Sequence, residues 1–200
     1  GVVSTLTTTQ LSGLASSQVA ALTTAQITAL TSTQVKGLST TQIDGLTAAQ
    51  VSAIDSADLA AATTTQIASL SGAQVAALTA VQLNALTTAE FQAFNSTEIR
   101  ALTTTQLGTL SGTRLSDFTS TQIGQLTNDQ VKSFSAGQIN ALSTTAVTGL
   151  TSSQVGSLNA ANLVAMTSTQ FGVLSTTQLD GFTGAQISKL QPSIVLAAST

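Results

Sequence analysis

The sequence predicts an all-α solenoid of very short capped helices, and three features of its 200 residues carry that prediction. A pattern of eight residues repeats without insertion or deletion from residue 6 to residue 189, which gives 23 octads. Numbering the eight positions as slots, most octads have Leu in slot one, Ser or Thr in slot two and Gln in slot five, with an apolar residue always in slot six. No charged residue occupies slot one or slot six, so these two rows are expected to form the core.

Slots two to five have the pattern of a helix start. In the unit Leu22, Thr23, Gln26 and Ile27, the Thr precedes the Gln by three residues. This is a capping box, in which the hydroxyl accepts from the third helical N–H and the Gln reaches back to the N–H of the cap residue. The apolar residues before and after the box form the hydrophobic staple that fixes the entry angle of the chain. Each octad therefore predicts its own helix start.

The same pattern excludes one long helix. Eight residues advance an α-helix by about 800°, so the Leu row drifts by about 80° per octad and never forms a stripe. Thr, Ser, Val, Ile and Gly are also poor residues for a helix interior. We therefore expect helices of about five to seven residues, each broken at a small residue and restarted by the next Ser or Thr. Because isolated helices of this length melt in water, neighbouring repeats must stabilise them.

A β-solenoid is the alternative fold. Thr, Val and Ile favour strands, and Gln side chains stack well in ladders. The spacing between slots one and six nevertheless alternates between five and three residues. These odd spacings place the two rows on opposite faces of a strand. The capping box explains both rows together, so the helical solenoid is favoured.

The domain organisation follows from the octads. Residues 1–5 form a lead-in, residues 6–189 a continuous solenoid, and residues 190–200 a terminal partial repeat. In that last segment Pro192 falls one residue after the cap slot, where a helix tolerates proline best.

Composition excludes most functional classes. The chain has no Cys, His, Trp or Tyr, so thiol nucleophiles, imidazole bases, disulfides and histidine metal sites are absent. A net charge of -3 with 5 basic residues does not suit a row of nucleic-acid phosphates. No run of about 20 apolar residues predicts a membrane span. We expect no enzyme activity, no cofactor, no nucleic-acid partner, and no catalytic, cofactor-binding or metal-binding residue.

Several groups resemble sites but have simpler interpretations. Asp55 and Asp58 form a carboxylate pair, but they occupy the cap and box slots of one octad and are interpreted as a capping variant. The slot-seven charges are interpreted as a solvated face. Asn95 opens a glycosylation sequon. All six Phe residues occupy slots one or six and are expected in the core.

Threonines spaced two apart, such as Thr7 and Thr9, offer hydroxyls for ice or carbohydrate. Slots three and four vary among Thr, Ser, Ala and Gly, so a flat ice-binding face is the less favoured hypothesis. No calcium-binding loop occurs in the sequence.

The run LTTAQITALTSTQVKGLSTTQIDGL, residues 22–46, resembles the Leu-Thr-x-x-Gln-Val/Ile octapeptide arrays of large secreted or surface-exposed bacterial proteins described as adhesin-like or RTX-like. The resemblance extends over nearly the whole chain. It implies an extracellular or bacterial-surface location and a structural role, as a self-assembling filament subunit or an adhesin stalk whose partners are copies of itself. The alternative is a solenoid scaffold that binds surface glycans or a host protein.

Overall fold

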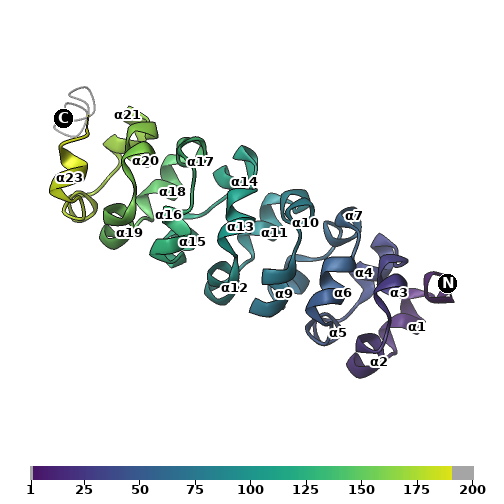
Figure 1. Cartoon of the computed structure of the whole chain (residues 1–200). Helices are drawn as coiled ribbons and strands as arrows, with labels where there is room; N and C mark the ends of the chain where they lie inside the picture. The colour runs from purple at the N-terminus through teal and green to yellow at the C-terminus, as the bar shows by residue number, and fades with distance from the viewer. Residues whose placement is uncertain (1, 191–200) are drawn as a thin grey trace. The chain divides into compact units, whose positions relative to one another are not determined.

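A computed structural model describes residues 2–190, and over that range every regular element is helical (Figure 1). This confirms the all-α solenoid and shows that the β-solenoid alternative is wrong for the described residues. Of the expected terminal segment 190–200, all but Leu190 lies outside the described range, Pro192 included. The chain divides into two compact units, Gly1–Leu102 and Thr103–Thr200.

The helices follow the octads one for one. The first unit contains η1 (Val2–Thr5), α1 (Thr8–Ser12), α2 (Ser16–Ala20), α3 (Thr24–Thr28), α4 (Ser32–Gly37), α5 (Thr40–Asp44), α6 (Ala48–Ala53), α7 (Ser56–Leu59), α8 (Thr64–Ile67), α9 (Gly72–Ala77), α10 (Ala80–Ala85), α11 (Thr88–Gln92) and α12 (Ser96–Ala101). The second contains α13 (Thr104–Gly108), α14 (Gly112–Ser116), α15 (Ser120–Gln125), α16 (Asn128–Lys132), α17 (Ala136–Ala141), α18 (Thr144–Thr148), α19 (Ser152–Ser157), α20 (Ala160–Ala165), α21 (Ser168–Gly172), α22 (Thr176–Leu179) and α23 (Gly184–Ile187).

Most helices begin with the predicted box, and α7, α14, α18 and α20 have the cap without it. Thr23 has extended backbone angles (φ -72°, ψ 157°), and its side chain accepts the Gln26 N–H. The Gln26 Oε1 atom in turn accepts the Thr23 N–H at 2.8 Å. Ala15 has no hydroxyl, so α2 keeps only the half supplied by Gln18, whose Oε1 accepts the Ala15 N–H at 2.8 Å. The box is therefore confirmed as the local signal that starts these helices.

The helices have four to six residues, so most lie within the expected five to seven, and α7, α8, α22 and α23 are one residue shorter. The six-residue helices end at slot eight, and the next residue, slot one of the following octad, has an extended backbone. Leu38 after α4 is an example (φ -68°, ψ 141°). Nowhere from residue 2 to residue 190 does a residue have positive φ. The helices therefore end without the left-handed glycine that commonly closes a helix.

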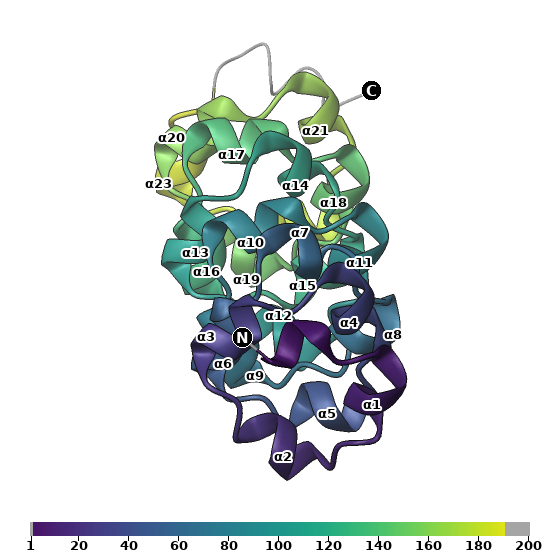
Figure 2. The ribbon, with the colours of Figure 1, turned by 90° about the vertical axis from the view of Figure 1, so that its right-hand side faces the viewer.

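Within each unit, a helix stacks on the helix three positions before it in the chain. In the first unit α1, α4, α7 and α10 form one column, α2, α5, α8 and α11 a second, and α3, α6, α9 and α12 a third. Figure 2 shows α2 and α5 as neighbours. In the second unit α13, α16, α19 and α22 form a column, as do α14, α17 and α20, and α15, α18 and α21. Three octads thus complete one turn within each unit.

The two apolar rows form the core, as predicted, except at Ile187 in slot six of the last octad, which is 55 % exposed. Val51 in slot six is fully buried and Ile54 in slot one is 4 % exposed. Five of the six Phe residues are buried, and Phe91 meets Phe94 edge-on with ring centroids 5.7 Å apart. The expectation that all six lie in the core is wrong for Phe182, which is only half-buried and stacks on Phe171.

Some stacked helices approach so closely that only glycine fits between them. A Cβ atom at Gly149, which ends α18, would lie 1.9 Å from the backbone oxygen of Ser120 on α15. Gly181, which follows α22, has the same relation to Ser152 on α19 at 2.1 Å. Both distances are far below van der Waals contact, so backbone meets backbone at these two positions.

Candidate functional site

A third buried row, which the sequence analysis did not identify, runs through slot five. Every buried polar or charged side chain within residues 3–190 belongs to this slot. Most are glutamines, such as Gln74 at 2 % exposure. Since burying an amide without hydrogen bonds costs free energy, each of these groups requires partners.

Gln74 on α9 shows how the amide is satisfied. Its Oε1 atom accepts the Ser71 N–H at 2.7 Å and closes the capping box of its own helix. Its Nε2 group donates to the carbonyl oxygens of Ile43 at 2.8 Å and Leu46 at 2.7 Å. Ile43 lies near the end of α5 and Leu46 just before α6. One side chain therefore caps the start of its own helix and binds carbonyls in the preceding turn.

The same arrangement recurs through both units, and we call it the glutamine ladder. Its described members donate from Nε2 to carbonyl oxygens 28 to 31 residues earlier in the chain. They are Gln34, Gln42, Gln50, Gln66, Gln74, Gln82, Gln138, Gln154, Gln170, Gln178 and Gln186. The last carbonyls of an α-helix have no partner inside that helix. The ladder supplies the missing donors, which explains how helices this short end without a left-handed cap.

Substitutions in slot five separate the two halves of the glutamine's role. Asn162 keeps the bond to the preceding turn, donating to the Phe134 carbonyl at 2.8 Å, but does not close a box. Glu98 does the reverse: its Oε2 accepts the Asn95 N–H at 2.6 Å, while its buried Oε1 has no hydrogen-bond partner. Burial raises the pKa of Glu98 from 4.5 to about 7, and the hydrogen bond from the Asn95 backbone opposes that shift.

Arg114 is the one cation in this row. It is 6 % exposed, and its guanidinium pairs with Asp117 at 2.7 Å. Ser111 still caps the helix by accepting the Arg114 N–H, but no side chain closes the box there. A charge in slot five gave no sequence signal of burial, because charged side chains are usually exposed.

The carboxylate pair behaves only in part as expected. Asp55 caps α7 by accepting the Ala57 N–H at 2.9 Å. Asp58 was expected to close the box and does not; it accepts a hydrogen bond from the Ser32 hydroxyl of the preceding turn instead. An aspartate is one methylene shorter than glutamate, so its carboxylate does not reach back to the cap. Within the described part of the chain, no three His, Cys, Asp or Glu side chains gather as a metal-binding group.

Some Ser and Thr hydroxyl groups cap helices, and others are exposed on the surface. In pairs such as Thr7 and Thr9, the first residue accepts a helix N–H and the second is exposed. Asn95 of the sequon likewise caps α12. Exposed hydroxyls gather along the column α2, α5, α8 and α11, and we call them the hydroxyl column. Its members are Ser17, Thr40, Thr41, Thr64, Thr65 and Thr88.

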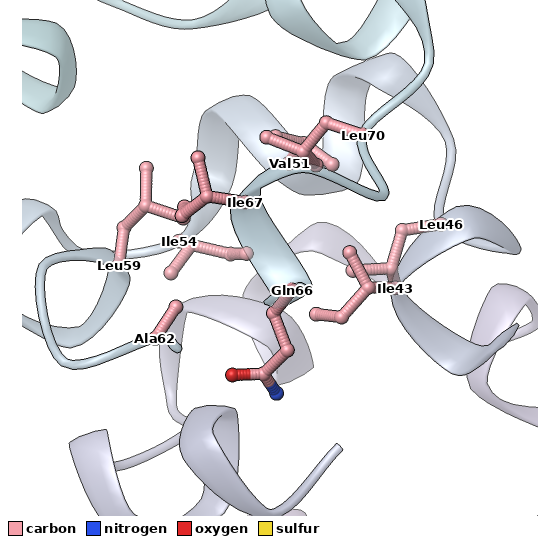
Figure 3. Close-up of a pocket in the computed structure, with 9 residues that line it drawn as sticks. All are labelled: Ile43, Leu46, Val51, Ile54, Leu59, Ala62, Gln66, Ile67 and Leu70. Carbon is pink, nitrogen blue, oxygen red and sulfur yellow. The ribbon is translucent and has the colours of Figure 1, made fainter. Parts of the chain in front are cut away.

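A small apolar cavity lies inside the first unit. Figure 3 shows Ile54, Leu59 and Ile67 grouped near Ala62, with the Gln66 amide on one side. Ala62 replaces the leucine usual in slot one, so the cavity occupies part of the volume that a leucine side chain would fill. The free space of about 10 Å³ is at the lower limit for one water molecule, too small for an organic ligand.

The fold and the ladder define the chain as a repeat protein of the all-α solenoid class. A family model described as the ALTTAQ repeat matches residues 51–88. The six letters themselves occur at residues 21–26, outside that match. A search of curated proteins finds no match. Among the described helices none has the length and apolar character needed to cross a bilayer.

Proposed function

We propose that the chain is a structural repeat protein of the bacterial cell surface or extracellular space, where it acts as a self-assembling filament subunit or an adhesin stalk. No catalytic step and no cofactor is part of this proposal. The resemblance to secreted octapeptide arrays and the similarity of residues 51–88 to the ALTTAQ repeat support a scaffold role.

The glutamine ladder is the observation that carries the proposal. Each turn supplies donors to the turn before it and carbonyl acceptors to the turn after it, as Gln74 and Ile43 illustrate. Such a unit gains stability by adding identical turns, because each addition satisfies groups that would otherwise remain unpaired. A repeat with this property suits a long load-bearing array better than a closed globule.

The glutamines of the first described octads act as caps alone. Gln10 and Gln18 are exposed, and their Oε1 atoms close the boxes of α1 and α2. Unlike the interior glutamines, these two do not donate from Nε2 to carbonyls of a preceding turn in the described chain. This separates the capping contact, which a glutamine makes within its own octad, from the contact to the preceding turn, which requires stacked turns.

Cryo-electron microscopy of the purified chain at high concentration tests the filament form of the proposal, with sedimentation velocity on the same sample. Ordered fibres in which successive chains continue the stacking of helices seen inside each unit would support the filament form. Monodisperse monomers at all concentrations would contradict self-assembly, and the adhesin stalk would then be the remaining form of the proposal. Single-molecule stretching tests the stalk. A stalk should unfold in small steps of one or a few turns, since each turn contacts only its neighbours.

The hydroxyl column favours a second candidate, a scaffold that binds surface glycans. Thr40, Thr41, Thr64 and Thr65 lie on stacked helices and are exposed, so they offer donors and acceptors to sugar hydroxyls. Glycan-array binding that is lost on Thr40→Ala with Thr64→Ala would support this function. The control is Thr9→Ala with Thr33→Ala, which removes exposed hydroxyls from the column of α1 and α4. Equal loss in both variants would contradict a site on the hydroxyl column.

A further inference from the structure

The glutamine ladder has a break at Glu98 on α12. Interior glutamines of the first unit donate from Nε2 to carbonyls 31 and 28 residues earlier, as Gln82 does to Val51 and Ile54. The same register at Glu98 leads to the carbonyls of Ile67 and Leu70. A carboxylate has no proton to donate there.

The Asn95 N–H hydrogen bond is the one described contact that compensates a negative charge on Glu98. Its side chain is 0 % exposed, and its Oε1 atom is buried without a hydrogen-bond partner. α9, on which α12 packs, has no titratable residue, and neither has the link from Ile67 to Ser71. The charged residues nearest to Glu98 along the chain are Glu90, on the preceding helix α11, and Arg100, which is exposed on α12 itself. Among the described residues, none forms an ion pair with Glu98.

We propose that Glu98 makes the α9–α12 contact a proton-sensitive joint of the glutamine ladder. When the carboxyl group is neutral, its Oε1–H donates to the Ile67 or Leu70 carbonyl, and Glu98 performs both roles of a ladder glutamine. When the proton leaves, Oε1 becomes a buried anionic acceptor facing carbonyl acceptors, and the joint loosens. The first unit is then tightest in acid and opens locally at this turn as the pH rises.

The direction of the pH effect follows from proton linkage. Desolvation raises the pKa of Glu98 to about 7 in the folded chain, against 4.5 for the unperturbed group, despite the opposing Asn95 hydrogen bond. The folded state therefore binds more protons than the unfolded state between these two values. The contribution of protonated Glu98 to folding stability is fully present below pH 4.5 and declines as the pH rises towards 7. Above pH 7 that contribution is lost.

The test is native-state hydrogen exchange with mass spectrometry across this pH range, corrected for intrinsic exchange, together with thermal unfolding. In the wild type, protection of peptides covering residues 67–75 and 95–102 should fall several-fold more than that of the other turns as the pH rises. Glu98→Gln should remove this local loss and raise the melting temperature by several degrees at pH 8, while changing little at pH 4.5.

Two further variants keep the proposal falsifiable. Gln74→Glu places a carboxyl group in the equivalent ladder position, 2 % exposed on α9, and should create a similar pH-dependent loss around Ile43 and Leu46. Asp44→Asn removes an exposed carboxylate on α5 and should leave the wild-type profile unchanged. If Glu98→Gln shows the same pH profile as the wild type, or if Asp44→Asn abolishes it, the proposal is overturned.

Discussion

The Nε2 group of Gln42 donates to the Leu14 carbonyl at 2.7 Å, 28 residues earlier, while its Oε1 accepts the Ser39 N–H at 2.9 Å. One amide thereby satisfies backbone groups at the start of one helix and beside the end of another. Helices of four to six residues are not stable alone. The ladder therefore makes the turn, rather than the helix, the unit that folds.

Removing a buried ladder glutamine should cost far more than removing an exposed one. Gln74→Ala deletes a cap and removes the side-chain donor to the buried carbonyls of Ile43 and Leu46, so we expect a loss of about 2–4 kcal/mol. Gln10→Ala deletes only the box contact to the Thr7 N–H, for a loss below about 1 kcal/mol. Urea denaturation of both variants measures the difference. Equal losses would mean that capping alone explains the glutamine.

Glycines at close backbone approaches should differ sharply from other glycines. Gly149→Ala forces a Cβ atom against the Ser120 carbonyl, and a loss of at least about 2 kcal/mol is expected from the displaced backbone. Gly137→Ala is the matched control, since no atom lies within 4 Å of its added Cβ. That change should stabilise α17 by about 0.5 kcal/mol because alanine favours helices. Thermal unfolding of the two variants checks the opposite signs.

Filling the cavity near Ala62 should stabilise the first unit. Ala62→Leu restores the usual slot-one residue among Ile54, Leu59 and Ile67, and we expect a gain of about 1 kcal/mol. Leu46→Ala, which enlarges the same cavity, should cost about 2–5 kcal/mol. Chemical denaturation measures both changes. A loss of stability in Ala62→Leu would show that the surrounding side chains have already closed on the alanine.

The defective cap of α2 should be repairable. Ala15→Ser adds the hydroxyl that accepts the Gln18 N–H in other octads, and the Gln18 half of the box already exists. A gain of about 1 kcal/mol is expected, with an equal loss for Ser39→Ala, which removes the same hydroxyl from α5. Hydrogen exchange at the first amides of each helix measures the local effect. No change in either variant would argue against hydroxyl capping as a source of stability.

Local rules accounted for most of what the sequence predicted. Thr23 and Gln26 form their box from residues three apart, and such short-range geometry depends little on the rest of the chain. Asp58 departed from prediction because its shorter side chain reaches Ser32 on another helix. The burial of Arg114 gave no signal in the sequence, because burial of a charge depends on a partner, Asp117, and on packing that the octad pattern does not encode.

By itself, the sequence determined where each helix begins, which two rows are apolar, and that the chain lacks the side chains of most catalytic and metal sites. Only the tertiary structure decided that three octads complete a turn and that slot five is buried. Both depend on contacts between residues some 30 positions apart, such as that of Gln42 with Leu11. A strictly periodic sequence shows every octad the same neighbours along the chain, so it contains no local signal of which octad packs on which.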